Sequence, residues 1–133
     1  MVYLLDTHAC IRLINPGLSP VKTRLLTLPA IEIILCSIVY TELCYGAYKS
    51  QQSERNLRLV EQFFQQFTTL SFDPMAGHVA GRIRAELESQ GTPIGSNDLL
   101  IAAIAIANDL TLVTHNVREF SRVSSLRYED WEA

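Results

Sequence analysis

The sequence lacks the segments that mark membrane and secreted proteins. None of its apolar runs approaches the roughly 20 residues that a membrane helix needs. The opening residues 1–6, MVYLLD, carry no basic side chain and reach an acidic residue too early for a secretory signal. We therefore expect a cytoplasmic protein that has no membrane partner.

Cysteine is scarce, and the cysteines that are present form no recognisable motif. The three cysteines are Cys10, Cys36 and Cys44. An odd number in apolar surroundings, without a CxxC pair, is typical of buried thiols in a reducing compartment and disfavours disulfides. The histidines also lack partners at the spacing of zinc ligands. The sequence therefore predicts neither a disulfide framework nor a zinc site.

An excess of positive charge is missing as well, since the formal net charge is -3. This argues against a surface that coats polyanions in general, but not against a nucleic-acid enzyme whose acidic site binds divalent cations. The 133 residues are 48% hydrophobic and 19% charged, which is typical of a globular domain. Because no repeat, low-complexity segment or linker interrupts them, we expect one domain over residues 1–133.

Short apolar segments alternate with helical patterns along the whole chain. Ser37 and Asp73 are predicted to cap helices, and an amphipathic helix is predicted over residues 54–67. The segments predicted as strands lie near residues 2–6, 32–36, 68–72, 110–114 and 125–128. This alternation predicts an α/β fold, in which helices cover a central parallel sheet.

Three acidic residues in apolar surroundings follow strands or open helices. Asp6 ends the first predicted strand, Glu42 lies in the helix after the second, and Asp98 lies in the first turn of an Ala-rich helix. Each alone is explained by helix capping, a polar surface or the helix dipole. Together they would meet at the carboxyl edge of the sheet, where carboxylates repel one another unless protonated or bridged by Mg²⁺ or Mn²⁺.

Other polar side chains are expected around this edge. Thr7 and Thr114 can orient neighbouring groups through their hydroxyls, and Arg118 and Arg122 are candidates for contacts with phosphates. Arginines are more often part of a solvated surface, and this alternative stays open. His8 and His115 are expected to line the same crevice, whereas His78 is an ordinary helix residue.

Four motifs together resemble a known family. They are LLDTH at the start, S-x-x-x-x-E-L from Ser37 to Leu43, IGSNDLLIAAIA and LTLVTHNVREF. In this order, and over nearly the whole chain, they resemble the VapC-type toxins of the PIN-domain ribonucleases. The resemblance implies a five-stranded parallel sheet in the order 3-2-1-4-5 with helices on both faces.

The resemblance also implies an activity and partners. Such proteins are Mg²⁺- or Mn²⁺-dependent endoribonucleases that cleave RNA of the translation machinery, commonly tRNA or rRNA. They are neutralised by a VapB-type antitoxin, usually dimerise and form larger toxin–antitoxin assemblies. The metal-binding acids of the family match Asp6, Glu42 and Asp98.

One departure from the family pattern concerns a fourth acid, whose place is taken here by Asn116. Asn116 can orient a water but brings no charge, and Glu119, one helical turn later, is expected to supply it. We therefore expect Asp6 and Asp98 to hold one ion directly. Glu42 would bind it through water or orient the nucleophile, and Asn116 and Glu119 would complete the shell.

Two other interpretations compete with a nuclease. LLDTH superficially resembles the haloacid-dehalogenase phosphatases, but these need a second acid two residues after the nucleophile, where this chain has His8. In the other interpretation the chain is a decayed binding module, in which the acids receive a basic antitoxin segment and Asn116 marks lost turnover. Affinity for Mn²⁺ distinguishes the decayed module from the enzyme.

Overall fold

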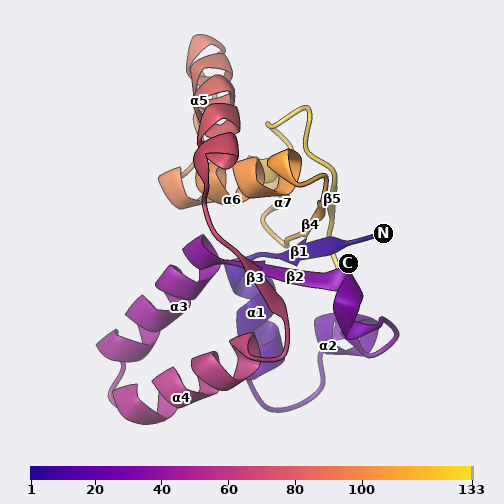
Figure 1. Ribbon diagram of the computed structural model, residues 1–133, viewed down its shortest axis with the longest axis vertical. Helices are drawn as coiled ribbons and strands as arrows, with labels where there is room; N and C mark the ends of the chain where they lie inside the picture. The colour runs from indigo at the N-terminus through magenta and orange to yellow at the C-terminus, as the bar shows by residue number, and fades with distance from the viewer. Residues whose placement is uncertain (133) are drawn as a thin grey trace.

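The centre of the protein is a parallel sheet, seen in a computed structural model that describes residues 1–132 (Figure 1). Within those residues the sheet has five strands in the order β3-β2-β1-β4-β5, and every neighbouring pair is parallel. The predicted fold class and strand order are therefore confirmed. The strands are β1 (Tyr3–Leu5), β2 (Ile33–Cys36), β3 (Thr68–Leu70), β4 (Thr111–Val113) and β5 (Tyr128–Glu129).

Helices connect the strands and cover the sheet from two sides. Figure 1 shows α1 to α4 on one side and α5 to α7 on the other. None of the helices in residues 1–132 has the length and apolar character needed to cross a membrane. The helices are α1 (Thr7–Ile14), α2 (Pro20–Leu25), α3 (Ser37–Lys49), α4 (Ser53–Phe64), α5 (Pro74–Ser89), α6 (Ser96–Ala107) and α7 (Val117–Phe120), with a 3₁₀ turn, η1, at Ala30–Glu32.

The central strands are apolar on both faces because helices pack against both. Leu4, Leu5, Leu35 and Leu112 are completely buried. Continuous apolar runs, rather than alternation, are what a parallel sheet covered on both sides requires. Helix α6 adds buried alanines and isoleucines to the same core, which explains why its sequence is apolar almost all round. This shared core holds α6, which carries Asp98, against the strands whose carboxyl ends lie near the other acids.

Three local predictions need correction. Ser37 is not the cap of α3 but its first residue; Cys36 holds the cap position, and the Ser37 hydroxyl accepts from the Phe72 N–H at 3.2 Å. Helix α4 ends at Phe64 rather than at residue 67, because the chain must turn before β3 begins. The last strand starts at Tyr128, later than predicted, since a turn closed by the Leu126 N–H and the Val123 carbonyl precedes it.

The start of α5 is as predicted and gives a test of stability. The Asp73 carboxylate accepts from the Ala76 N–H at 2.9 Å, and Pro74 occupies the first turn. Asp73→Ala is expected to lower the free energy of unfolding by about 1 kcal/mol, because the amide loses its partner. Urea denaturation measures this change.

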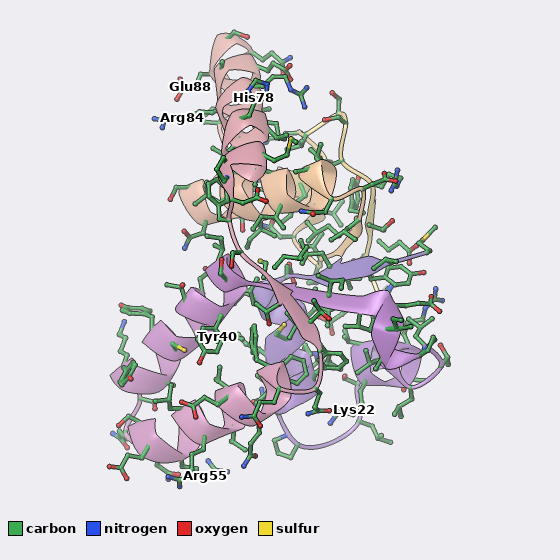
Figure 2. All side chains as sticks on the ribbon, in the orientation of Figure 1. Lys22, Tyr40, Arg55, His78, Arg84 and Glu88 are labelled. Carbon is green, nitrogen blue, oxygen red and sulfur yellow. The ribbon has the colours of Figure 1, made fainter. Side chains whose placement is uncertain are left out.

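Two control variants separate capping from other effects at this helix. Asp73→Asn retains a capping oxygen and should leave stability nearly unchanged. Glu88→Ala removes an exposed ion pair with Arg84 on the same helix (Figure 2) and should cost at most about 0.5 kcal/mol. Equal losses in Asp73→Ala and Asp73→Asn would show that the cap contributes nothing.

Candidate active site

Asp6 lies where β1 passes into α1, and the backbone fixes its position. Its side chain accepts from the Ala9 N–H at 2.9 Å and so caps α1, while its own N–H donates to the Val113 carbonyl of β4 at 3.1 Å. The residue is only 5% exposed. Asp6 therefore serves as a helix cap and at the same time presents a carboxylate at the carboxyl ends of β1 and β4.

Glu42 reaches the same edge from α3. Its carboxylate accepts a short hydrogen bond from the hydroxyl of Thr7, the residue that follows Asp6. Because α3 begins directly after β2, the neighbour of β1 in the sheet, the helix carries Glu42 toward the end of β1. The predicted role of Thr7 in positioning a neighbour thus has a structural counterpart.

Asp98, Asn116 and Glu119 form a second group, held by hydrogen bonds. The Asn116 side-chain amide donates to Asp98 Oδ2 at 3.1 Å and to Glu119 Oε2 at 2.8 Å. Glu119 also accepts from the Gly95 N–H at 2.8 Å. The Thr114 hydroxyl accepts from the Asn116 N–H at 2.9 Å, which orients the turn after β4. Asn116 therefore joins the two acids to each other.

The pKa values indicate that these two groups of acids share one electrostatic field. The pKa of Asp98 is raised to about 7, first by burial, then by the hydrogen bond with Glu119 and the charges of Glu119, Glu42 and Asp6. The pKa of Glu119 is lowered to about 2, chiefly by its hydrogen bond with Asp98. Asp98 and Glu119 thus hold one proton between them at mildly acidic pH, with Asp98 as its carrier.

Burial also raises the pKa of Asp6, although hydrogen bonds from Thr114 and the Ala9 N–H oppose the rise. Thr114, predicted to support the site, therefore favours the ionised form of Asp6. A buried carboxylate with few hydrogen bonds, facing other carboxylates, is poorly compensated by the protein alone. A bound cation would relieve this repulsion.

The donor set suits a hard divalent cation. Mg²⁺ and Mn²⁺ prefer carboxylate and amide oxygens and keep some positions for water. Within residues 1–132, no three His, Cys, Asp or Glu side chains are gathered as a ready metal-binding group. Hydrogen bonds from Thr7 and Asn116 hold Glu42 and Asp98, and these side chains would turn toward an ion.

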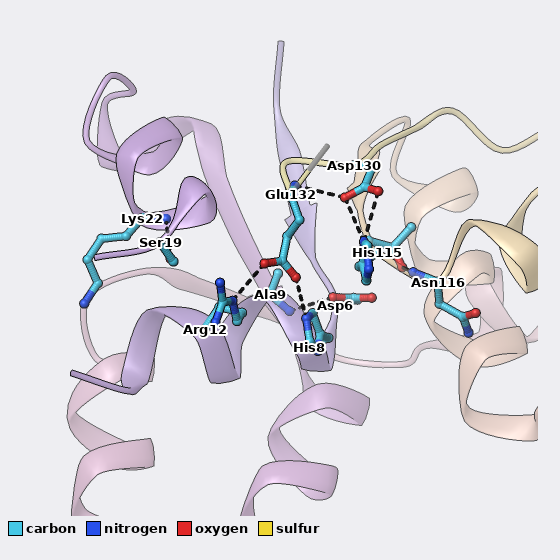
Figure 3. A network of polar contacts seen from close by, with 11 residues as sticks. Asp6, His8, Ala9, Arg12, Ser19, Lys22, His115, Asn116, Asp130 and Glu132 are labelled. Atoms are coloured by element: carbon cyan, nitrogen blue, oxygen red, sulfur yellow. Dashed lines mark hydrogen bonds and ion pairs between the residues drawn. The ribbon is translucent and has the colours of Figure 1, made fainter. Parts of the chain in front are cut away.

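The rim of the site contains a polar network that the sequence does not reveal (Figure 3). Glu132 pairs with His8 at 2.6 Å and with Arg12 at 2.9 Å, and Asp130 pairs with His115 at 3.0 Å. His8 and Glu132 are 124 positions apart in the chain, so no local pattern links them. The folding of the segment after β5 onto α1 brings them together.

The two arginines predicted to contact phosphates differ in their surroundings. Arg122 donates to the Pro93 carbonyl at 2.7 Å and so braces the loop before α6. Arg118 lies exposed on α7, one residue before Glu119. Arg118 thus has the freer side chain for a ligand, whereas Arg122 has a structural contact.

The strand order and the carboxylates at the carboxyl edge define the class of protein, an α/β domain with an acidic site. The chain belongs to the PIN-domain family, whose profile matches residues 3–126, and within it to the VapC ribonucleases. The resemblance inferred from the four sequence motifs is thereby confirmed.

Relatives and solved structures agree with this assignment. A tRNA(fMet)-specific endonuclease VapC of Shigella flexneri is 43% identical over 129 residues, 97% of each chain. Ribonuclease VapC2 of Rickettsia felis is 39% identical over 133 residues, 99% of each chain. A chain of the DNA-bound VapBC complex of Salmonella typhimurium superposes with a TM-score of 0.91 at 40% identity, covering 98% of each chain. In VapBC2 of Rickettsia felis, bound to a promoter DNA fragment, the TM-score is 0.90 at 38% identity, covering 98% of this chain and 99% of that one.

Proposed function

We propose that this protein is a Mg²⁺- or Mn²⁺-dependent endoribonuclease toxin. The observation that carries the proposal is the site itself: carboxylates from three separate elements lie near the carboxyl edge of the sheet. Burial first, and then the hydrogen bond with Glu119 and the charges of Glu119, Glu42 and Asp6, raise the pKa of Asp98 to about 7. Such an arrangement is costly for the fold and is explained by a cation that the acids bind. The 39–43% identity to named VapC ribonucleases supports the same reaction.

Each acid is assigned a role from its surroundings. Asp6 and Asp98 would hold the ion directly: Asp6 is buried and Asp98 half-buried, and the charge of Asp6 contributes to the raised pKa of Asp98. Glu42, already oriented by Thr7, would bind it through water or orient the attacking water. Asn116 and Glu119 would complete the shell. A bound divalent ion supplies an activated water and stabilises the charge that develops on the phosphodiester.

The partners are proposed from the relatives. One relative is named as specific for tRNA(fMet), which favours an RNA of the translation machinery, tRNA or rRNA, as the substrate here. Solved VapBC complexes of two relatives favour a VapB-type antitoxin as partner. We propose in addition that the toxin forms a homodimer inside a larger toxin–antitoxin assembly. These partners belong in the cytoplasm, where we place the protein.

The affinity for Mn²⁺ is expected to rise with pH and to level off above about 7, because the pKa of Asp98 is about 7. Below that pH its carboxyl carries a proton that the ion must displace, so affinity should change about tenfold per pH unit. Isothermal titration calorimetry measures this directly. Asp98→Asn should show no measurable Mn²⁺ binding at any pH in this range, and a wild-type affinity independent of pH would contradict the assignment.

Cleavage of total cellular RNA tests the proposal as a whole. Purified protein would be incubated with Mn²⁺, Mg²⁺ or EDTA beside Asp98→Asn, and the new 5′ ends would be mapped. Discrete cuts that require metal and disappear in the variant support the toxin and name its target. Cuts shared by the variant would indicate a contaminating nuclease. No cuts, together with little affinity for Mn²⁺, would favour the decayed binding module.

A further inference from the structure

His8 and His115 form a stacked pair at the rim of the acidic site. Their ring centroids are 5.7 Å apart and their planes differ by 27°. His8 lies in the first turn of α1, two residues after Asp6, whereas His115 follows β4 and precedes Asn116. The pair is therefore built from the same two strand ends that position the acids, although neither imidazole has a part in the proposed metal shell.

Each imidazole is anchored at one nitrogen and open elsewhere. His8 Nε2 meets Glu132 at 2.6 Å and His115 Nδ1 meets Asp130 at 3.0 Å (Figure 3). The carboxylate side chains are only 15% and 20% exposed, but the histidine side chains are 48% and 58% exposed. The rings are thus held in place while their surfaces face solvent. Binding of a ligand would therefore cost little entropy for ordering the two histidine side chains.

We infer that this pair is a stacking site for a nucleobase of the RNA substrate, next to the phosphate that is cleaved. Unstacked bases of single-stranded RNA bind on the faces of aromatic side chains, histidine included. A base inserted between the two rings would need ring planes about 7 Å apart, twice the normal contact distance. The ring centroids are only 5.7 Å apart, so the base stacks on an outward face of the pair. The inference rests on the proposed ribonuclease function.

The surrounding charges favour a base over a phosphate as the ligand. A phosphate would be attracted only to protonated imidazoles, and each imidazole already faces a carboxylate that offsets its positive charge. The remaining cation of the network, Arg12, is likewise paired with Glu132. Stacking of a base on an imidazole ring does not require an unpaired positive charge.

Proton NMR of the histidine rings tests the inference without any cleavage. The sequence has three histidines, and the third, His78, lies on α5 at the far end of the molecule (Figure 2), so it is an internal control. The protein would be titrated with short single-stranded oligoadenylate in EDTA, at one fixed pH. Ring protons of His8 and His115 should shift upfield, and those of His78 should stay. Equal shifts in all three, or none, would overturn the inference.

Substitutions separate stacking from a merely structural role. His115→Ala should weaken oligonucleotide binding about tenfold, and His115→Phe should restore most of it because a planar ring returns. In cleavage, the same changes should appear in KM more than in kcat. His78→Ala should match the wild type. If Phe and Ala at residue 115 weaken binding equally, the anchor to Asp130 matters and the ring face does not. A wild type that shows the NMR shifts but cleaves no RNA would refute the proposed function and leave the stacking site standing.

Discussion

Asp98→Asn is expected to abolish RNA cleavage, by about 10³-fold or more, while making the protein more stable at alkaline pH. A metal ligand contributes several kcal/mol to the transition state, and each 1.4 kcal/mol is about tenfold in rate. The gain in stability has a separate origin. The amide replaces a carboxyl that the fold prefers to keep protonated, and like the protonated acid it can donate to Glu119.

The pH dependence of stability follows from the sign of the shift. The pKa of Asp98 is about 7 in the fold against an ordinary value of 3.8, so the unfolded chain releases this proton first. The wild type should therefore lose stability as pH rises between these two values, and Asp98→Asn should lose less. Urea denaturation at several pH values measures this. A variant that is inactive and also destabilised at about pH 8 would indicate misfolding rather than a lost metal ligand.

Asp6→Asn and Asp6→Ala are both expected to be inactive, but only the second should be unstable. Asp6 caps α1 through the Ala9 N–H, and asparagine caps a helix about as well as aspartate. Asp6→Asn thus keeps the cap and loses the charge, whereas Asp6→Ala loses both and should cost about 1 kcal/mol of unfolding free energy. Cleavage rates and urea denaturation on the same preparations separate the two effects.

The two Asp6 variants can also contradict this account. Substantial cleavage by Asp6→Asn would mean that the charge of Asp6 is not needed for metal binding, and that the residue is important only as a cap. Loss of folding in both variants would assign Asp6 to the structure alone. Asp6→Asn and Asp6→Ala differ only in the side-chain amide with its capping oxygen, so a difference between their unfolding free energies measures the contribution of the cap.

Much of the fold follows from local pattern. Val2 to Leu5 and Leu110 to Val113 are apolar runs too short for helices, and Asp73-Pro74 is a helix start with a known mechanism. Ser37 shows the limit of such reasoning. A serine before a helix is a good cap, but its hydroxyl bonds instead to Phe72, a contact across 35 positions that only the folded sheet creates. The end of α4 is likewise set by where β3 must begin.

Some features of the candidate site could likewise be predicted from the sequence, and others could not. The placement of Asp6, Glu42 and Asp98 near one edge could be predicted, because Asp6 ends a strand, Asp98 opens a helix, Glu42 lies in the helix after a strand, and parallel strands end at one edge. Their role as metal ligands stays a prediction. The two hydrogen bonds from Asn116 to Asp98 and to Glu119 could not be predicted, since they depend on the turn after β4. Asp130 and Glu132 had no signal at all, because their partners are distant in sequence and surface acids are common.

The most direct test that Asp6 and Asp98 hold a metal ion is a crystal structure of the protein with Mn²⁺, in which anomalous scattering locates the ion. We predict one anomalous peak at about 2.0–2.2 Å from oxygens of Asp6 and Asp98, with Glu42 in reach directly or through water, and no such peak in Asp98→Asn. A peak elsewhere on the protein, or no peak at a pH where Asp98 is ionised, would contradict the assignment of these acids as the metal site.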